Sequence, residues 1–288
     1  MGVHMPKVGI VTDSTNCLPA ELIKEYNIRV APYHLIMEGK DYVDQIDMTP
    51  AEFWQRFRDL KEIPTTGVPG PGELVNIFTE LAKSTDSIVC VDVSKAISAI
   101  YESVRVARET VMGKHPNLKI EYIDSKCSAG ALGFIVLEAA RAAQAGKSLS
   151  EVVKIAQDLV PKVKLIFALA TLKYLIKGGR APKTAYIGEL LQVKPIIGFV
   201  NDTGLVQSLG KERGKRKAML KLVDMVKNYA DTDKPLHIIV HYTDRIEDGV
   251  ELREMITSRY NCAEVYMTDL TPVMTVHTGP AVGLSFYS

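Results

Sequence analysis

The chain has 288 residues, of which 47% are hydrophobic and 24% charged, and its formal net charge is +1. This composition is typical of a folded globular protein long enough for two domains. The near-zero charge argues against nucleic acid or an anionic membrane as the main partner. No apolar run is long enough to cross a bilayer, and the start does not have the pattern of a secretory signal. We therefore expect a cytoplasmic protein without stable membrane insertion.

The cysteines predict neither disulfides nor a metal site. There are four, far apart and without a C-x-x-C pair: Cys17, Cys90, Cys127 and Cys262. Small disulfide-framed proteins and zinc sites both need closer and more regular spacing. We expect four reduced thiols, as in other cytoplasmic proteins.

The first half of the chain alternates apolar runs with helical patterns. Short apolar runs predict strands at 8–11, 88–91 and 119–123, and the apolar run 28–37 predicts another extended segment. One-sided apolar spacing and capping signals predict helices at 19–26, from 50, from 71, at 98–112 and at 132–145. Strands separated by helices indicate a parallel sheet covered on both faces.

The second half has a different pattern. A helix at 149–159 leads to a strand at 165–170, and runs at 196–200 and 205–209 flank Asn201-Asp202-Thr203-Gly204, which is a hairpin signal. The second half is completed by a helix at 215–229 and by strands at 237–241 and 264–267, with a helix between the two strands. We expect an N-terminal α/β domain over residues 6–161 and a C-terminal α+β two-layer domain over residues 162–288.

Two motifs have simpler interpretations than the functions they suggest. Gly146-Lys147-Ser148 ends like a phosphate-binding loop, but Arg141 stands where its first glycine should be, so we interpret Gly146 as a helix end. The run Lys211 to Lys217 holds five basic residues, which is typical of a solvated helix start. A docking patch for an acidic or phosphorylated partner and a DNA-binding surface are the alternatives, and the net charge argues against the second.

Hydroxyl-rich segments fall just beyond predicted strands, where ligand sites gather in open α/β sheets. These segments are Asp13-Ser14-Thr15, the stretch from Ser94 to Ser98, the loop holding Thr65 and Thr66, and His277-Thr278 near the C-terminus. Each also has a structural interpretation. Ser98 fits a helix N-cap, and the two threonines fit turn positions beside prolines.

Together the segments resemble the DegV family, which includes the fatty-acid-binding subunits of bacterial fatty-acid kinase. The resemblance runs from about Val8 to Gly283. Its carriers are Val11-Thr12-Asp13-Ser14-Thr15, Pro64-Thr65-Thr66-Gly67-Val68-Pro69, Val93 to Ser98, Leu172-Lys173-Tyr174-Leu175, Gly178-Gly179-Arg180, Lys194-Pro195-Ile196 and His277-Thr278-Gly279-Pro280.

The resemblance implies two α/β domains with a lipid tail buried between them. It places the carboxylate of a long-chain fatty acid on Thr66 and Ser98, with Thr65, Ser94, His277 and Thr278 as neighbours and Arg180 near the mouth. It also implies no catalytic residue, metal or cofactor in this chain. An ATP-dependent fatty-acid kinase would be the partner that forms the acyl phosphate for phospholipid synthesis.

Two segments depart from the family pattern. The loop that usually reads Thr-Ser-Gln-Pro is Thr66-Gly67-Val68-Pro69, which lacks one hydroxyl and one amide, and the usual Leu-Ser-Gly is Ile97-Ser98-Ala99. The alternative function is a stand-alone acyl-ester hydrolase pairing Ser98 with His277. No G-x-S-x-G motif supports that alternative.

Overall fold

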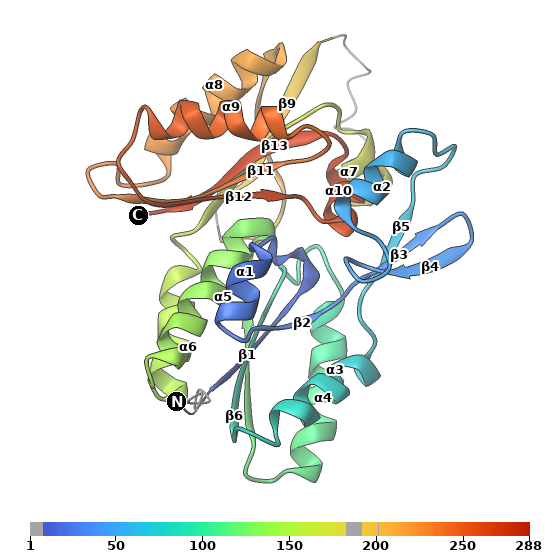
Figure 1. Cartoon of the computed structure of the whole chain (residues 1–288), viewed down its shortest axis with the longest axis vertical. Coiled ribbons are helices and arrows are strands. Elements are labelled where there is room, and N and C mark those ends of the chain that lie inside the picture. The colour runs from blue at the N-terminus through green and yellow to red at the C-terminus, as the bar shows by residue number, and fades with distance from the viewer. Residues whose placement is uncertain (1–7, 183–191, 201) are drawn as a thin grey trace.

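The computed structural model describes residues 8–182, 192–200 and 202–288. The described strands form two large sheets, one above the other in the view of Figure 1, and a small sheet at their side. A parallel α/β lobe is followed by a mixed α+β lobe, which confirms the fold class predicted from the sequence.

The first lobe is built on a four-stranded parallel sheet. Its order is β2 (Arg29–Ala31), β1 (Gly9–Asp13), β6 (Ser87–Asp92) and β7 (Lys119–Asp124). On one side α3 (Pro71–Leu81) packs against α4 (Ile100–Lys114), and on the other α5 (Ala129–Gln144) packs against α6 (Leu149–Leu159), while the short α1 (Ala20–Glu25) follows β1 (Figure 1). The two central strands, β1 and β6, are almost wholly buried, as expected of a parallel sheet covered on both faces.

The second lobe is built on a six-stranded sheet. Its order is β10 (Gln207–Arg213), β9 (Val193–Phe199), β8 (Lys164–Leu169), β13 (Ala281–Tyr287), β11 (Leu236–Tyr242) and β12 (Cys262–Asp269). Only β11 and β12 pair in parallel. The helices α8 (Lys215–Met225) and α9 (Ile246–Thr257) cover one face (Figure 1), and α5 of the first lobe packs on the other.

A small unit at the side holds elements from both halves of the chain. Its sheet has the order β4 (Lys40–Val43), β3 (His34–Met37) and β5 (Thr65–Gly67). The helix α2 (Pro50–Phe57) packs here, and α10 (Pro272–Thr278) adds one apolar residue from near the C-terminus and contacts α7 (Lys173–Lys177). The capping box predicted at Thr49 is present, with the Thr49 hydroxyl accepting from the Glu52 amide at 3.3 Å.

One continuous core joins the two lobes. Phe134 and Ile135 on α5, Val91 on β6 and Phe167 on β8 belong to it, and none is more than 2% exposed. The predicted boundary near residue 161 falls between α6 and β8. The division into two domains at this residue stays a prediction, because α5, which lies before it, packs against both large sheets.

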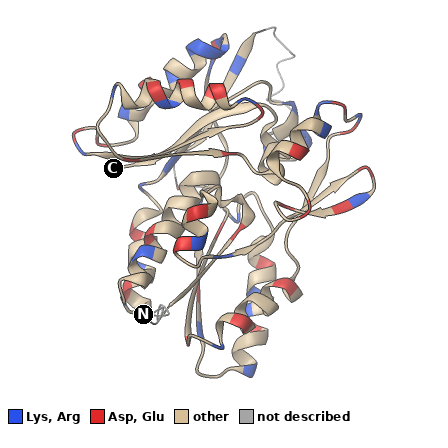
Figure 2. Cartoon of the chain, viewed as in Figure 1, with Lys and Arg blue, Asp and Glu red and all other residues tan. Residues whose placement is uncertain are grey.

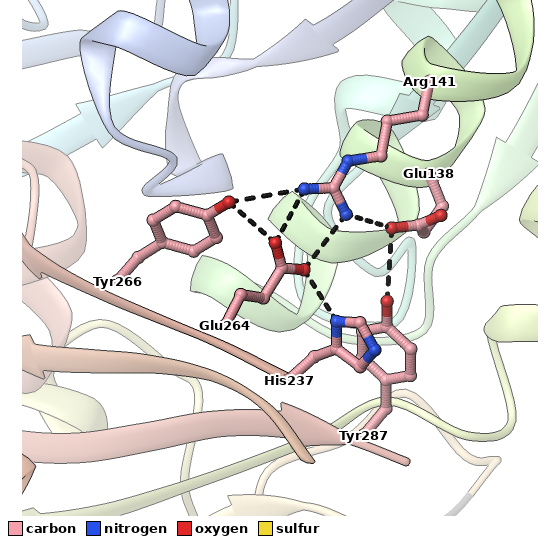
Figure 3. Close-up of polar contacts among 6 residues, drawn as sticks. All are labelled: Glu138, Arg141, His237, Glu264, Tyr266 and Tyr287. Carbon is pink, nitrogen blue, oxygen red and sulfur yellow. Dashed lines mark hydrogen bonds and ion pairs between the residues drawn. The ribbon is translucent and has the colours of Figure 1, made fainter. Parts of the chain in front are cut away.

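A polar network also joins α5 to the six-stranded sheet (Figure 3). We call it the Arg141 network; its members are Glu138, Arg141, His237, Glu264, Tyr266 and Tyr287. Arg141 donates to the two carboxylate oxygens of Glu264 at 3.0 and 2.7 Å and to Glu138 at 2.6 Å. His237 stacks on Tyr287 with ring centroids 4.3 Å apart.

Within that network the carboxylate of Glu264 is held ionised. Burial alone would raise its pKa, but hydrogen bonds from Arg141, His237 and Tyr266 outweigh burial and lower the pKa to about 2. The network therefore fixes a charged group of β12 against a helix of the first lobe.

Several predicted elements differ from those observed. The run 28–37 is not one strand, because Pro32 stands between β2, in the first sheet, and β3, in the small one. Thr65 and Thr66 lie in strand β5 rather than in a loop, and Ser98 lies two residues before α4, whose N-cap is Ala99. The strand β13 and the helix α10 were not predicted at all.

Other predictions are confirmed. Strands β9 and β10 form the antiparallel hairpin, although β10 begins at Gln207 and carries a bulge, and Asn201 lies outside the described residues. Gly146 follows α5 with φ of 79°, as expected of a helix end. The four cysteines are free.

The basic run from Lys211 to Lys217 is only partly a helix start. Its first three residues lie in β10 and its last three open α8 (Figure 2). Lys215 is already paired with Asp248 at 2.5 Å, and Arg216 lies 3.6 Å from Glu251. The run is therefore a solvated surface whose charge is partly balanced by α9.

Candidate lipid-binding site

The carboxyl ends of β1 and β6 are tied together by a buried carboxylate. Asp13 accepts from the amide of Thr15 at 2.7 Å, from the Thr15 hydroxyl at 2.6 Å and from the amide of Val93 at 2.7 Å. Asp13 is fully buried, and that burial raises its pKa despite these hydrogen bonds. The segment from Val93 to Ser98 is thereby fixed against the first strand.

Ser98 lies at the end of this segment, beside a tyrosine from another part of the first lobe. Its Oγ is 2.6 Å from the hydroxyl of Tyr33 and accepts from the amide of Ile100 at 3.2 Å. Tyr33 precedes β3 and is 3% exposed. Burial raises the pKa of Tyr33 well above its ordinary value, so its phenol keeps its proton.

A second hydroxyl is paired with His277. The Nε2 of His277, on α10, lies 2.9 Å from the Oγ1 of Thr66, on β5. Burial and the nearby Arg180 cation lower the pKa of His277 to about 3, so the imidazole is neutral at pH 7.

The other ring nitrogen of His277 decides the tautomer. Its Nδ1 is buried without a hydrogen-bond partner among the described residues, and Gly178 lies so close that a Cβ there would clash with this atom. A buried donor without a partner is rarer than a buried acceptor without one. The proton therefore belongs on Nε2, from which His277 donates to Thr66.

The helix that carries His277 is anchored by a second buried carboxylate. Asp44 accepts from the Ser14 hydroxyl at 2.6 Å and from the Val273 amide, in the first turn of α10, at 3.2 Å. Burial raises the pKa of Asp44 to about 6. The start of α10 is thus tied to the residue that follows β1.

A cavity lies where these segments meet β8 and β9. We call it the seam cavity; its volume is about 60 Å³, or about 570 Å³ when all the space between atoms, open solvent included, is counted. Its walls are mainly apolar, and the apolar lining residues include Leu165, Phe167, Ile197, Phe199, Val206 and Met274. Its polar lining comes from Thr15, Tyr33, Ser98, Ser128, Arg180, His277 and Thr278.

Four of the seven residues predicted for the ligand line this cavity, namely Ser98, Arg180, His277 and Thr278. Thr66 does not line it but reaches it through His277. Thr278 is buried, and its hydroxyl donates to the carbonyls of Met274 and Gly279, at 3.2 and 3.0 Å. The Thr278 hydroxyl proton is therefore not available to a ligand.

The other two predicted residues lie outside the lining. Thr65 is exposed on β5. Ser94 is fully buried and donates to the carbonyl of Gly204, in the turn of the β9–β10 hairpin, at 2.8 Å. A Cβ at Gly204 would clash with the Ser94 hydroxyl, so this close approach needs glycine. Ser94 thus holds the hairpin whose Val206 forms part of the cavity wall.

Among the described residues that line the cavity, Arg180 is the one with a permanent positive charge. Its Nη1 donates to the carbonyl of Gly178 at 2.5 Å. Burial lowers the pKa of this guanidinium, and the side chain remains partly exposed. Sequence reasoning missed Tyr33 and Ser128, because a single tyrosine or serine outside a recognised motif carries no signal for a ligand.

The hydroxyl–imidazole pairing needed for a hydrolase is not favoured by this geometry. Ser98 is bonded to Tyr33, whereas His277 is bonded to Thr66. Within residues 8–182, 192–200 and 202–288, no group of three or more His, Cys, Asp or Glu side chains is placed to hold a metal ion. In the same ranges no helix is both long and apolar enough to span a bilayer.

Known proteins resemble the chain over its full length. It is 33% identical over 284 residues to a DegV domain-containing protein of Caldanaerobacter subterraneus, covering 98% of this chain and 99% of that one. A fatty-acid-binding DegV-family protein from Thermus thermophilus superposes with a TM-score of 0.88 at 27% identity, covering 98% and 99% of the two chains. A stearic-acid-binding protein from Eubacterium ventriosum gives a TM-score of 0.88 at 26% identity, with 98% of both chains covered.

The sequence profile described as "Uncharacterised protein, DegV family" matches residues 7–288. The chain therefore belongs to the DegV family.

Proposed function

We propose that the chain binds one long-chain fatty acid with its tail in the seam cavity and presents the carboxylate to a partner fatty-acid kinase. The observation that carries this proposal is a mainly apolar cavity whose polar lining includes Ser98, Tyr33 and His277. Each buried methylene of a tail contributes about 0.8 kcal/mol, so a long chain supplies most of the binding free energy. The relatives that bind fatty acids support the same ligand class.

The head group needs donors, because an unpaired buried carboxylate is very costly. We assign it to the hydroxyls of Thr66 and Ser98, with the neutral His277 bonded to Thr66 and Arg180 near the mouth. Neutral hydroxyl donors leave the carboxylate oxygens accessible to a phosphoryl donor, whereas a bidentate arginine pair would hold them. Ser94 then holds the hairpin that forms part of the cavity wall. Thr65 and Thr278 are neighbours that make no direct hydrogen bond to the head group.

The reaction would belong to the partner. The chain has no phosphate-binding loop of the G-x-x-x-x-G-K-[ST] type, so ATP binding and phosphoryl transfer are assigned to an ATP-dependent fatty-acid kinase. The chain would work as its carrier subunit in the cytoplasm, without a cofactor, and would feed acyl phosphate to phospholipid synthesis.

Lipid extraction tests the ligand and the head-group site together. Purified protein is extracted with organic solvent and the extract is examined by mass spectrometry, for wild type and for Thr66→Ala/Ser98→Ala. We expect about one fatty acid per wild-type chain and clearly less in the variant. The matched control is Thr110→Ala/Ser258→Ala, which removes two exposed helix hydroxyls bonded to their own backbone.

The outcomes separate the functions. A wild type that carries no lipid and gains no thermal stability from added fatty acid contradicts the carrier function. Adding kinase and ATP, and trapping acyl phosphate with hydroxylamine, tests the partner. Turnover of an acyl ester by the purified chain would instead favour the hydrolase.

A further inference from the structure

We propose that Tyr33 is a positioning residue for the head group: its phenol donates to Ser98 and so directs the Ser98 proton at the bound carboxylate. The inference rests on the proposed function, because it assumes an acid in the seam cavity. It adds a residue that no sequence motif marked and explains how Ser98 discriminates a carboxylate from a neutral head group.

The hydrogen bonds around Ser98 restrict where its proton can point. A serine hydroxyl has one donor and two acceptor positions. The amide of Ile100 fills one acceptor position at 3.2 Å, and Tyr33 OH lies at 2.6 Å. If Tyr33 donates, both acceptor positions are filled and the serine proton is free for a third partner.

The opposite direction would remove this donor. If Ser98 donated to Tyr33, the serine would offer the carboxylate only lone pairs. A phenol is a much stronger acid than an aliphatic hydroxyl, so it is the better donor of the pair. Because burial keeps the Tyr33 phenol protonated, its proton is present throughout the physiological pH range.

Tyr33 is fixed well enough to act in this way. It is 3% exposed, and its own amide donates to the Ser14 hydroxyl at 3.1 Å. That hydroxyl in turn donates to Asp44 at 2.6 Å. Both Tyr33 and Ser98 line the seam cavity, so the free serine proton can point into it.

The same arrangement occurs at the second head-group hydroxyl. His277 donates from Nε2 to Thr66, which leaves the threonine proton free. In each pair a neighbouring side chain supplies a hydrogen bond to the hydroxyl, whose own proton is then left for another acceptor. An ionised head group gains from two aligned O–H donors, whereas an alcohol of the same length gains much less.

The experiment measures the affinities of a C16 fatty acid and the C16 alcohol at pH 8 for wild type, Tyr33→Phe, Ser98→Ala and the double variant. We expect Tyr33→Phe to weaken the acid about tenfold and the alcohol by less than roughly threefold. Because Tyr33 acts through Ser98, the double variant should bind the acid about as well as Ser98→Ala alone. The control Tyr260→Phe removes a phenol that donates to the Val223 carbonyl, and should change neither affinity.

Each result decides the inference. Unchanged acid affinity in Tyr33→Phe, equal losses for acid and alcohol, or additive losses in the double variant would overturn the role of Tyr33 while leaving fatty-acid binding intact. A wild type that binds neither ligand would overturn the proposed function itself. If Tyr33→Phe does not fold, 3-fluorotyrosine at this position keeps the shape and strengthens the donor; it should retain the acid affinity, and a loss would contradict the inference.

Discussion

Replacement of Arg141 by methionine tests how strongly the Arg141 network holds α5 to the six-stranded sheet. Methionine keeps most of the apolar stem and removes the guanidinium that bridges Glu138 and Glu264. Both carboxylates then lose a charged partner in a half-buried setting, and an uncompensated buried charge is costly.

The expected loss of stability follows from how far the two side chains are exposed to solvent. The side chains of Arg141 and Glu264 are 29% and 17% exposed, between a surface pair and a buried one. Exposed pairs contribute about 0.2–1 kcal/mol, whereas breaking a buried pair costs about 3–5 kcal/mol. We expect Arg141→Met to lower the free energy of unfolding by about 2 kcal/mol, or the Tm by roughly 4–8 °C.

The assay is thermal and urea unfolding beside a matched variant on another helix. Arg105 bonds Glu102 and Glu109 on the surface of α4, with side chains 47–65% exposed, so Arg105→Met should cost under about 0.5 kcal/mol. Equal stabilities of the two variants would refute the reasoning, because the lobe contact would then contribute no more than a surface ion pair.

The pH dependence gives an independent check. Glu264 has a pKa of about 2 when folded, below its ordinary value of 4.5, so its contribution to stability is present above pH 4.5 and is lost as the pH falls toward 2. The difference between wild type and Arg141→Met should narrow over that interval. A difference that stays constant from pH 6 to pH 2.5 would assign the loss to packing instead.

Three further predictions concern the cavity. Gly178→Ala should displace the His277 imidazole, because the added Cβ would clash with the ring. No hydroxyl is removed, yet titration should show fatty-acid binding weakened about tenfold or more. Unchanged affinity would show that the ring is not held by this contact. Ser94→Ala should leave the Gly204 carbonyl without its hydrogen bond and lower the free energy of unfolding by about 1 kcal/mol. It should also speed lipid release. A stopped-flow release rate equal to that of wild type would contradict the role of Ser94 in holding the cavity wall. Because the pKa of His277 is about 3 and that of Asp44 about 6, fatty-acid affinity should change less than about twofold from pH 7 to 9; a midpoint within that interval would show a charged imidazole.

The regular elements of the first lobe could be predicted because their signals are local. The strand 88–91 and the capping box at Thr49 depend on neighbouring residues, and both are confirmed. The helix α10 could not be predicted in this way, since its seven residues are nearly all buried and show no polar face. Similarly, the break at Pro32 depends on which sheet each half of the run joins, and that is a tertiary choice.

The residues proposed for the head group could be named from the sequence, but not their hydrogen-bond partners. Recognition of the Ser98 and His277 motifs said nothing of Tyr33, which approaches Ser98 from 65 residues away. Ser94 was expected beside the carboxylate, and the structure instead bonds it to a turn 110 residues later. A motif identifies residue types in order along the chain, whereas a hydroxyl's bonding partner is set by the folded geometry.

The position of the seam cavity links ligand binding to cohesion between the lobes. Ser98 and Tyr33 come from the first lobe, whereas Phe167 and Ile197 come from the sheet of the second, so a tail in this cavity would contact both lobes. A ligand that binds only the folded chain adds about 2.7 kcal/mol at a concentration 100 times its Kd. That gain is close to the loss expected for Arg141→Met, so saturating fatty acid should return the variant's Tm to about that of the ligand-free wild type. If fatty acid raises the Tm of Arg105→Met but not that of Arg141→Met, the cavity itself depends on the Arg141 network.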